Sequence, residues 1–129
     1  MATIKSYTDL EQSRKLAEIL PLESADMRFC FSHTLDGRIT GHYPMIGNEP
    51  SLGTVPCWSL VALLSVLPKE VEIDGQRYAP CLFPIQDKWL LKLWYNSNHT
   101  ITSPIAIFSD NPVDACVEMI LRLNELNLL

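Results

Sequence analysis

Cys57 is the residue of this chain whose type and position most directly suggest chemistry. It follows Pro56 and opens a stretch of eleven residues, 57–67, without a charged side chain. A proline is common at the first position of a helix, so we expect a helix over about 57–67 with the thiol in its first turn. The helix dipole and the unpaired amides there favour the nucleophilic thiolate. Cys57 is therefore a candidate nucleophile, and a packed thiol at a helix start is the alternative.

A cysteine nucleophile also needs a histidine within hydrogen-bond reach and a group that orients this histidine. His99 follows the helix at the head of a predicted strand, which is the chain order of papain-like hydrolases, and His42 is the other candidate base. The loop over residues 44–56 would then serve as a lid. Because the glycine-rich oxyanion segment of those enzymes is missing before Cys57, we expect a packed thiol and assign no catalytic residue.

His33 and His42 form a second constellation, on either side of the dipeptide Asp36-Gly37. This dipeptide is favoured in two-residue hairpin turns, and such a turn pairs His33 with Thr40. His42 then becomes the diagonal neighbour of His33, about 7 Å away, which is near enough for two imidazoles to share one metal ion. No third ligand stands nearby, and two histidines at the rim of an aromatic face are the alternative. We expect no metal and no other cofactor.

The strand predicted over residues 88–95 supplies a third candidate site. Trp89, Leu91 and their alternate neighbours fill one face, while Leu90, Lys92 and Trp94 lie on the other. We expect this second face to be at least half exposed, because lysines alternate with its apolar residues. An exposed tryptophan beside lysines can contact a ligand, another protein or a second copy of the chain. A hairpin or helix that covers the face is the alternative.

Charge and composition exclude several classes of function. The net charge is −5 and the few Lys and Arg residues are scattered among acids, whereas nucleic-acid binding needs several cations on one surface. The longest apolar run, residues 55–67, is far short of the roughly 20 residues that span a bilayer. The four cysteines form no CxxC pair, and no export signal is present. We expect a cytoplasmic protein that binds neither nucleic acid nor membranes.

Helices over about 9–20, 57–67 and 112–126 are predicted from capping signals and apolar stripes. The first begins at a Thr-x-x-Glu capping box formed by Thr8 and Glu11, and the last has Pro112 in its first turn. The wet stripe of the last helix is predicted to hold four charged residues: Asp114, Glu118, Arg122 and Glu125. These helices are segregated from the strands rather than alternating with them.

The strands are predicted to form an antiparallel meander. Asp36-Gly37 and Asp74-Gly75 mark two hairpins, and strands follow over 88–95 and about 100–108. Pro80 and Pro84 predict that the return strand of the second hairpin lies at an edge or bends. The sequence therefore predicts a single two-layer α+β domain over residues 1–129, with three helices and one antiparallel sheet of about 4–6 strands.

Three blocks of the sequence together carry a resemblance to a known family. They are residues 11–27 (EQSRKLAEILPLESADM), 56–60 (PCWSL) and 110–117 (DNPVDACV). The chain resembles short uncharacterised bacterial proteins of about this length that are often met in phage-like or mobile-element settings. No activity is assigned to that family, so the resemblance implies an origin but no functional residue.

The sequence thus favours a small accessory protein that acts by binding another protein or a second copy of itself. The acidic charge, the apolar segment 57–67 and the half-apolar sheet face with Leu90, Lys92 and Trp94 point to this function. A cysteine-dependent hydrolase that uses Cys57 with His99 or His42 is the alternative. A metal-binding or small-molecule-binding module is a third hypothesis.

Overall fold

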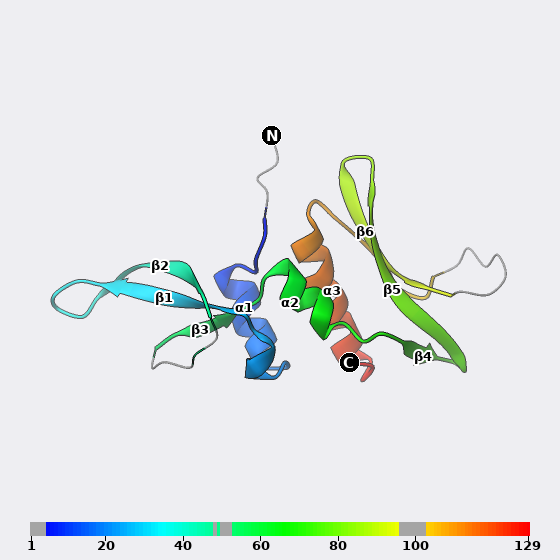
Figure 1. Cartoon of the computed structure of the whole chain (residues 1–129), viewed down its shortest axis with the longest axis horizontal. Helices are drawn as coiled ribbons and strands as arrows, with labels where there is room; N and C mark the ends of the chain where they lie inside the picture. Colours follow the sequence, from blue (N-terminus) through cyan, green and yellow to red (C-terminus); the bar gives the residue numbers. More distant parts are fainter. Residues whose placement is uncertain (1–4, 48, 50–52, 96–102) are drawn as a thin grey trace. The chain divides into compact units, whose positions relative to one another are not determined.

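The computed structural model describes residues 5–47, 49, 53–95 and 103–129 (Figure 1). Its three α-helices and two antiparallel sheets confirm the predicted α+β class. The chain divides into two compact units, one of residues 6–62 and one of residues 63–129 together with residues 1–5. The organisation of residues 1–129 as a single domain stays a prediction.

The unit of residues 6–62 combines a helix with a three-stranded antiparallel sheet in the order β2-β1-β3 (blue to green in Figure 1). Its elements, in chain order, are α1 (Leu10–Ala17), the short 3-10 helix η1 (Leu22–Ser24), β1 (Met27–His33), β2 (Ile39–Ile46), β3 (Val55–Cys57) and the start of α2 (Leu60–Val66). Helix α1 packs on β3. His33, His42 and Cys57 thus lie on three different strands of one sheet, β1, β2 and β3 respectively.

Helix α1 begins one residue later than the sequence predicted. Asp9, not Thr8, is the N-cap: its carboxylate accepts the Gln12 N–H at 2.8 Å, and the Gln12 side chain accepts the Asp9 N–H at 3.1 Å. A carboxylate stabilises the unpaired amides of the first turn at least as well as a hydroxyl does. The predicted capping box of Thr8 and Glu11 is therefore wrong by one position, and Thr8 is free for another role.

Thr8 is fully buried and joins the chain before α1 to the chain after β3. Its hydroxyl accepts the Trp58 N–H at 3.1 Å and lies 2.7 Å from the hydroxyl of Ser13, which is also buried. Its main-chain N–H donates to the Trp58 carbonyl at 2.9 Å. Each polar group in this cluster finds a partner, as buried polar groups must.

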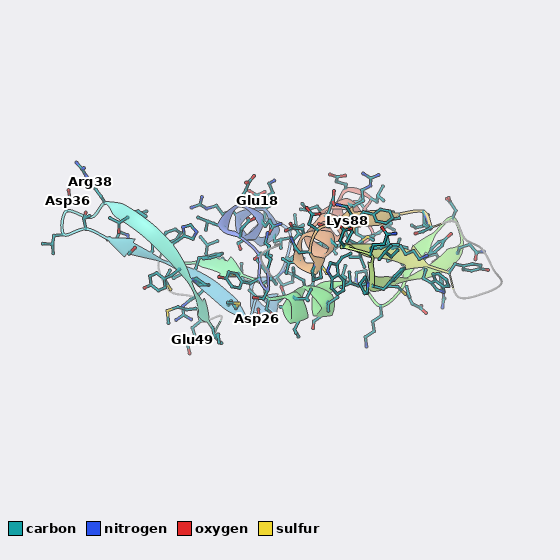
Figure 2. All side chains as sticks on the ribbon, turned by 90° about the horizontal axis from the view of Figure 1, so that it is seen from above. Glu18, Asp26, Asp36, Arg38, Glu49 and Lys88 are labelled. Atoms are coloured by element: carbon teal, nitrogen blue, oxygen red, sulfur yellow. The ribbon has the colours of Figure 1, made fainter. Side chains whose placement is uncertain are left out.

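The first hairpin turns through more residues than the two that Asp36-Gly37 predicted. His33 pairs with Ile39, and the intervening loop is closed by the Thr34 N–H, which donates to the Arg38 carbonyl at 2.8 Å. Gly37 has a φ of +86°, a conformation that glycine adopts without strain. The turn is thus of the three-residue type with a glycine bulge. The pairing also shifts between Ser32 and His33, where Thr40 has no ladder partner on β1. Figure 2 shows Asp36 and Arg38 at its tip.

Helix α2 begins at Leu60, three residues after the predicted start at Cys57. Ser59 is the reason, since its hydroxyl accepts the Ala62 N–H at 3.2 Å, which is the contact of an N-cap. The Asp26 carboxylate in turn accepts the Ser59 N–H at 2.9 Å and the Ser59 hydroxyl. Pro56 and Cys57 belong to β3, which pairs with β1, so the predicted helix over 57–67 is too long at its N-terminal end.

The unit of residues 63–129 contains a four-stranded antiparallel sheet in the order β4-β5-β6-β7 and the long helix α3. Its elements after α2 are β4 (Val71–Ile73), β5 (Gln76–Ile85), β6 (Lys88–Trp94), β7 (Ala106–Ser109) and α3 (Pro112–Glu125). The Asp74-Gly75 turn is confirmed, with Ile73 paired to Gln76 and positive φ values of 52° and 81° at the two turn residues. Such values are typical of a two-residue hairpin turn.

Helix α3 follows the sequence prediction closely. The Asn111 side chain caps it by accepting the Asp114 N–H at 2.8 Å, and Pro112 stands in its first turn. The apolar stripe that faces the sheet strands β6 and β7 is buried; it comprises Val113, Cys116, Val117, Ile120 and Leu123. This unit is therefore a helix layer on a sheet layer, as predicted for the whole chain.

The strands form two sheets, whereas the sequence predicted one. Strand β3 returns to β1, where Met27 pairs with Cys57 and Phe29 with Val55. This pairing completes the first sheet before the chain enters α2, so the Asp74-Gly75 hairpin starts a new sheet. A three-residue strand that contains Pro56 has too little pattern to predict from sequence alone.

We predict that Thr8→Val lowers the free energy of unfolding by about 1–3 kcal/mol. The variant keeps the shape of the side chain but leaves the buried Trp58 N–H and the Ser13 hydroxyl without their partner. Urea denaturation measures the effect. Thr8→Ser, which keeps the hydroxyl, is the matched control and loses less stability. A Thr8→Val protein as stable as the wild type would contradict a structural role for this hydroxyl.

Candidate functional site

Cys57 lies at the end of β3 and is 0% exposed. Its Sγ lies 3.6 Å from the Thr8 hydroxyl and 3.5 Å from the Thr8 carbonyl oxygen. Burial raises the pKa of this thiol, because the charged thiolate loses its hydration. The predicted position of Cys57 in the first turn of a helix is wrong, since α2 starts only at Leu60. The surroundings of Cys57 are those of a packed thiol.

The candidate bases for Cys57 are not brought to it by the described part of the chain. Cys57 is opposite Met27 on one side of β1, whereas His42 is opposite Phe31 on the other side of the same strand. Four residues along a strand span about 13 Å, which is far beyond hydrogen-bond reach. His99 lies outside the described residues.

His42 packs against two aromatic rings. Its ring centroid lies 5.3 Å from that of Phe29 in an edge-to-face arrangement and 6.3 Å from that of Phe31. Phe31 is opposite His42, as the two-residue turn predicted, and only the partner of His33 changes, from Thr40 to Ile39. Among the described residues, no cluster of three or more histidine, cysteine or acidic side chains could hold a metal ion. These contacts agree with the alternative of a histidine on the rim of an aromatic face.

Leu90, Lys92 and Trp94 do lie together, on one face of the four-stranded sheet that we call the outer face. Ladder pairing places Phe83 and Phe108 on either side of Leu90. The same pairing adds Ala79, Cys81, Ile85 and Ala106 to the outer face. The face therefore extends over three strands and is largely apolar.

Exposure differs strongly across the outer face. Leu90 is only 6% exposed because its aromatic neighbours cover it, whereas Trp94 is 44% and Phe108 59% exposed. Helix α3 covers the opposite face, where Leu91, Leu93 and Ile107 are buried. The predicted exposure of this face therefore holds at Trp94, whereas Leu90 is covered.

Lys92 is held over two rings of the outer face. Its Nζ lies 4.4 Å from the Trp94 ring centroid and 5.5 Å from the Phe83 ring centroid. Each cation–π contact of this kind is worth about 0.5–1 kcal/mol where solvent is near. At the rim of the face, a hydrogen bond from Lys88 Nζ to Asp110 at 2.9 Å raises the pKa of Lys88. The outer face thus combines exposed aromatic rings with cations in fixed positions.

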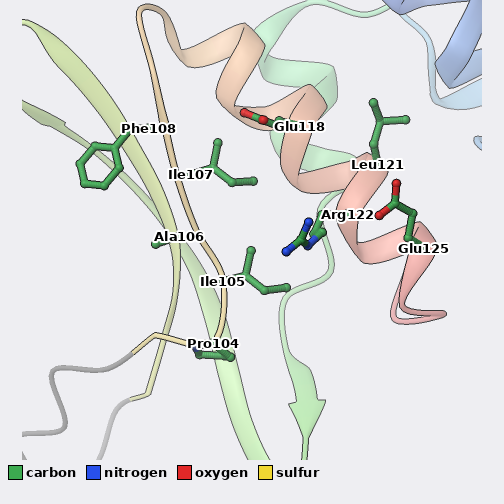
Figure 3. Close-up of a pocket in the computed structure, with 9 residues that line it drawn as sticks. All are labelled: Pro104, Ile105, Ala106, Ile107, Phe108, Glu118, Leu121, Arg122 and Glu125. Carbon is green, nitrogen blue, oxygen red and sulfur yellow. The ribbon is translucent and has the colours of Figure 1, made fainter.

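A groove lies between β7 and α3, next to the outer face (Figure 3). Its volume is about 520 Å³, and residues 104–108 line one side while Glu118, Leu121, Arg122 and Glu125 line the other. In Figure 3, Ile105 and Ile107 point towards α3 and Phe108 points away from it. The sequence predicts Glu118, Arg122 and Glu125 on a solvated stripe, and the structure adds that β7 lies opposite them across the groove.

Comparisons of the chain with protein-family models, with curated protein sequences and with solved structures gave no match. The resemblance to short bacterial proteins of phage-like settings therefore stays a prediction. Within the described ranges, no helix combines the length and the apolar character that crossing a membrane requires.

We predict that iodoacetamide at pH 8 alkylates Cys57 and Cys116 at least about tenfold more slowly than Cys30 and Cys81. The first two thiols are buried, and burial raises their pKa, that of Cys116 to about 12. The other two are partly exposed. Mass spectrometry of tryptic peptides measures the four rates, with the urea-unfolded chain as the control in which all four react alike. Preferential alkylation of Cys57 in the folded protein would revive the hydrolase hypothesis.

Proposed function

We propose that this chain is a cytoplasmic protein-binding or accessory module of phage or mobile-element origin that docks another protein on its outer face. The observation that carries the proposal is the row of exposed aromatic side chains around Leu90 and Lys92. Trp94 and Phe108 flank these two residues and are about half exposed. Contiguous apolar patches of this kind on a protein surface are typical of interaction sites.

The shape of the outer face favours a protein over a small molecule. Its side chains come from β5, β6 and β7 and spread over a sheet surface, whereas sites for small molecules are concave and enclose most of the ligand. Large aromatic side chains at the centre of an interface commonly supply most of its binding energy. Trp94 and Phe108 are the residues best placed for that role.

The contacts of Lys92 support the same function. A lysine loses side-chain freedom when a partner buries it, which opposes binding. Because Lys92 already lies over the rings of Phe83 and Trp94, part of that loss has occurred before the partner arrives. The net charge of −5 argues against nucleic acid as the partner.

We predict that the double variant Trp94→Ser/Phe108→Ser loses at least about tenfold in affinity for the partner while it keeps the fold, because both rings are half exposed in the free protein. The tagged wild type and variant are compared by quantitative mass spectrometry of the proteins they retain from lysate of a bacterium that carries the gene. Leu35→Ser, at the exposed tip of the first hairpin, is the matched control.

Proteins that the wild type and the control retain, and that the double variant loses, would support the proposal. Sedimentation of the purified wild type tests self-association in parallel. A strict monomer that retains the same proteins as the double variant would overturn the proposed function.

A further inference from the structure

The open edge of β7 offers main-chain hydrogen bonds that nothing in the described chain uses. The Leu93 N–H donates to the Ile105 carbonyl at 3.1 Å, and Leu91 is opposite Ile107. In an antiparallel ladder, successive residues direct their main-chain groups to alternate sides. The N–H and C=O groups of Ala106 and Phe108 therefore point away from β6, and β7 is the last strand of its sheet. This edge presents two donors and two acceptors to a further strand.

The opposite side of the sheet is less suited to such pairing. Strand β4 covers β5 only from Gln76 to Tyr78, and β5 then continues to Ile85 with one side open. Pro80 and Pro84 stand in this stretch, at positions whose main chain faces outward by the same alternation. Proline has no N–H to donate, so an added strand finds few donors there. Strand β7 contains no proline, and the two sides of the sheet differ in this respect.

Helix α3 forms a wall beside the open edge of β7, with the groove of about 520 Å³ between them (Figure 3). The side chains of an added strand would alternate between two environments. Those on one side would enter the groove and meet Glu118, Leu121, Arg122 and Glu125. Those on the other side would lie next to Phe108 and extend the outer face. A sheet edge beside a helix is a common arrangement for binding an extended peptide.

The charges of the groove indicate which side chains would fit. Glu118 and Glu125 lie one turn before and one turn after Arg122 on α3, and all three are exposed. None of them forms an ion pair with another described residue. The wall therefore has one surplus negative charge. A lysine or arginine can lay its aliphatic stem along Leu121 while its charged end reaches a carboxylate.

We propose that the β7 edge binds an extended segment of the partner protein as a fifth strand, with basic side chains facing α3 and apolar side chains facing Phe108. This inference rests on the proposed function and specifies the chemistry of the partner. A second copy of the chain fits less well. Two-fold pairing of β7 with itself would add a second α3 with the same surplus negative charge and no basic side chain in β7 to match it.

The test uses a fluorescent eight-residue peptide that alternates valine and lysine. A peptide of alternating valine and glutamate tests the sign of the charge, and four valines followed by four lysines test attraction without alternation. We expect the alternating valine–lysine peptide to bind at least tenfold more tightly than either control in a polarisation titration. Hydrogen exchange should show new protection at the amides of Ala106 and Phe108 when this peptide is bound.

Ala106→Pro removes one of the two open donors, and Ala106→Val is its matched control because it keeps the N–H and suits a strand. We expect Ala106→Pro to weaken the peptide at least tenfold and Ala106→Val less than twofold. Glu118→Gln/Glu125→Gln should weaken it at least fivefold. Thermal unfolding verifies that each variant is folded. If Ala106→Pro does not fold, hydrogen exchange on the wild type with bound peptide tests whether the β7 edge pairs with the peptide.

Three results would overturn strand addition of a basic peptide: equal binding of the block peptide, no protection of Ala106 and Phe108 at millimolar peptide, or full affinity in a folded Ala106→Pro protein. A wild-type dimer that Ala106→Pro converts to monomer would assign the edge to a second copy instead. A partner protein that Trp94→Ser/Phe108→Ser loses but Ala106→Pro retains would overturn this inference and leave the proposed function standing.

Discussion

The pairing of β7 with β6 is the constraint on which the properties of the four-stranded sheet depend. Leu91 opposite Ile107, with the hydrogen bond from Leu93 to Ile105, sends both isoleucines to the α3 side and Phe108 to the outer face. A slip of one residue would exchange these two sets, because side chains alternate along a strand. It would also turn the free main-chain groups of Ala106 inward. The register of β7 on β6 thus determines both the outer face and the open edge. Phe108 contributes its side chain to the first and its main-chain groups to the second.

The unit of residues 6–62 is held by a different kind of interaction. Thr8 connects the residues before α1 to those after β3 through hydrogen bonds of its hydroxyl and its main-chain amide. A small buried polar cluster therefore holds these two segments together. Asp26 repeats this pattern by anchoring Ser59 at the start of α2. Cys57 lies inside the Thr8 cluster, where its thiol contacts the hydroxyl and the carbonyl oxygen of Thr8 and is not exposed to solvent. The residue with the most suggestive sequence context is therefore part of the scaffold.

Sequence reasoning succeeded where local chemistry decides the structure. Asn111 and Pro112 start α3, and Asp74-Gly75 closes a hairpin, because cap and turn preferences act within a few residues. It failed at Cys57, where pairing of β3 with distant β1 prevailed over the helix signal of Pro56. Leu90, Lys92 and Trp94 could be placed together from alternation alone. The groove could not, since it depends on which strand is last in the sheet and on where α3 lies beside it.

The prolines of β5 have a consequence for the assembly of many molecules. An open-ended filament of sheets requires two complementary edges on every subunit, one to receive and one to be received. Pro80 and Pro84 remove outward donors from one side of this sheet, while Ala106 and Phe108 keep theirs on the other. This sheet therefore offers most of its free donors on the β7 side, which disfavours repeated addition of further strands. Pro80 and Pro84 thereby disfavour open-ended growth through the four-stranded sheet.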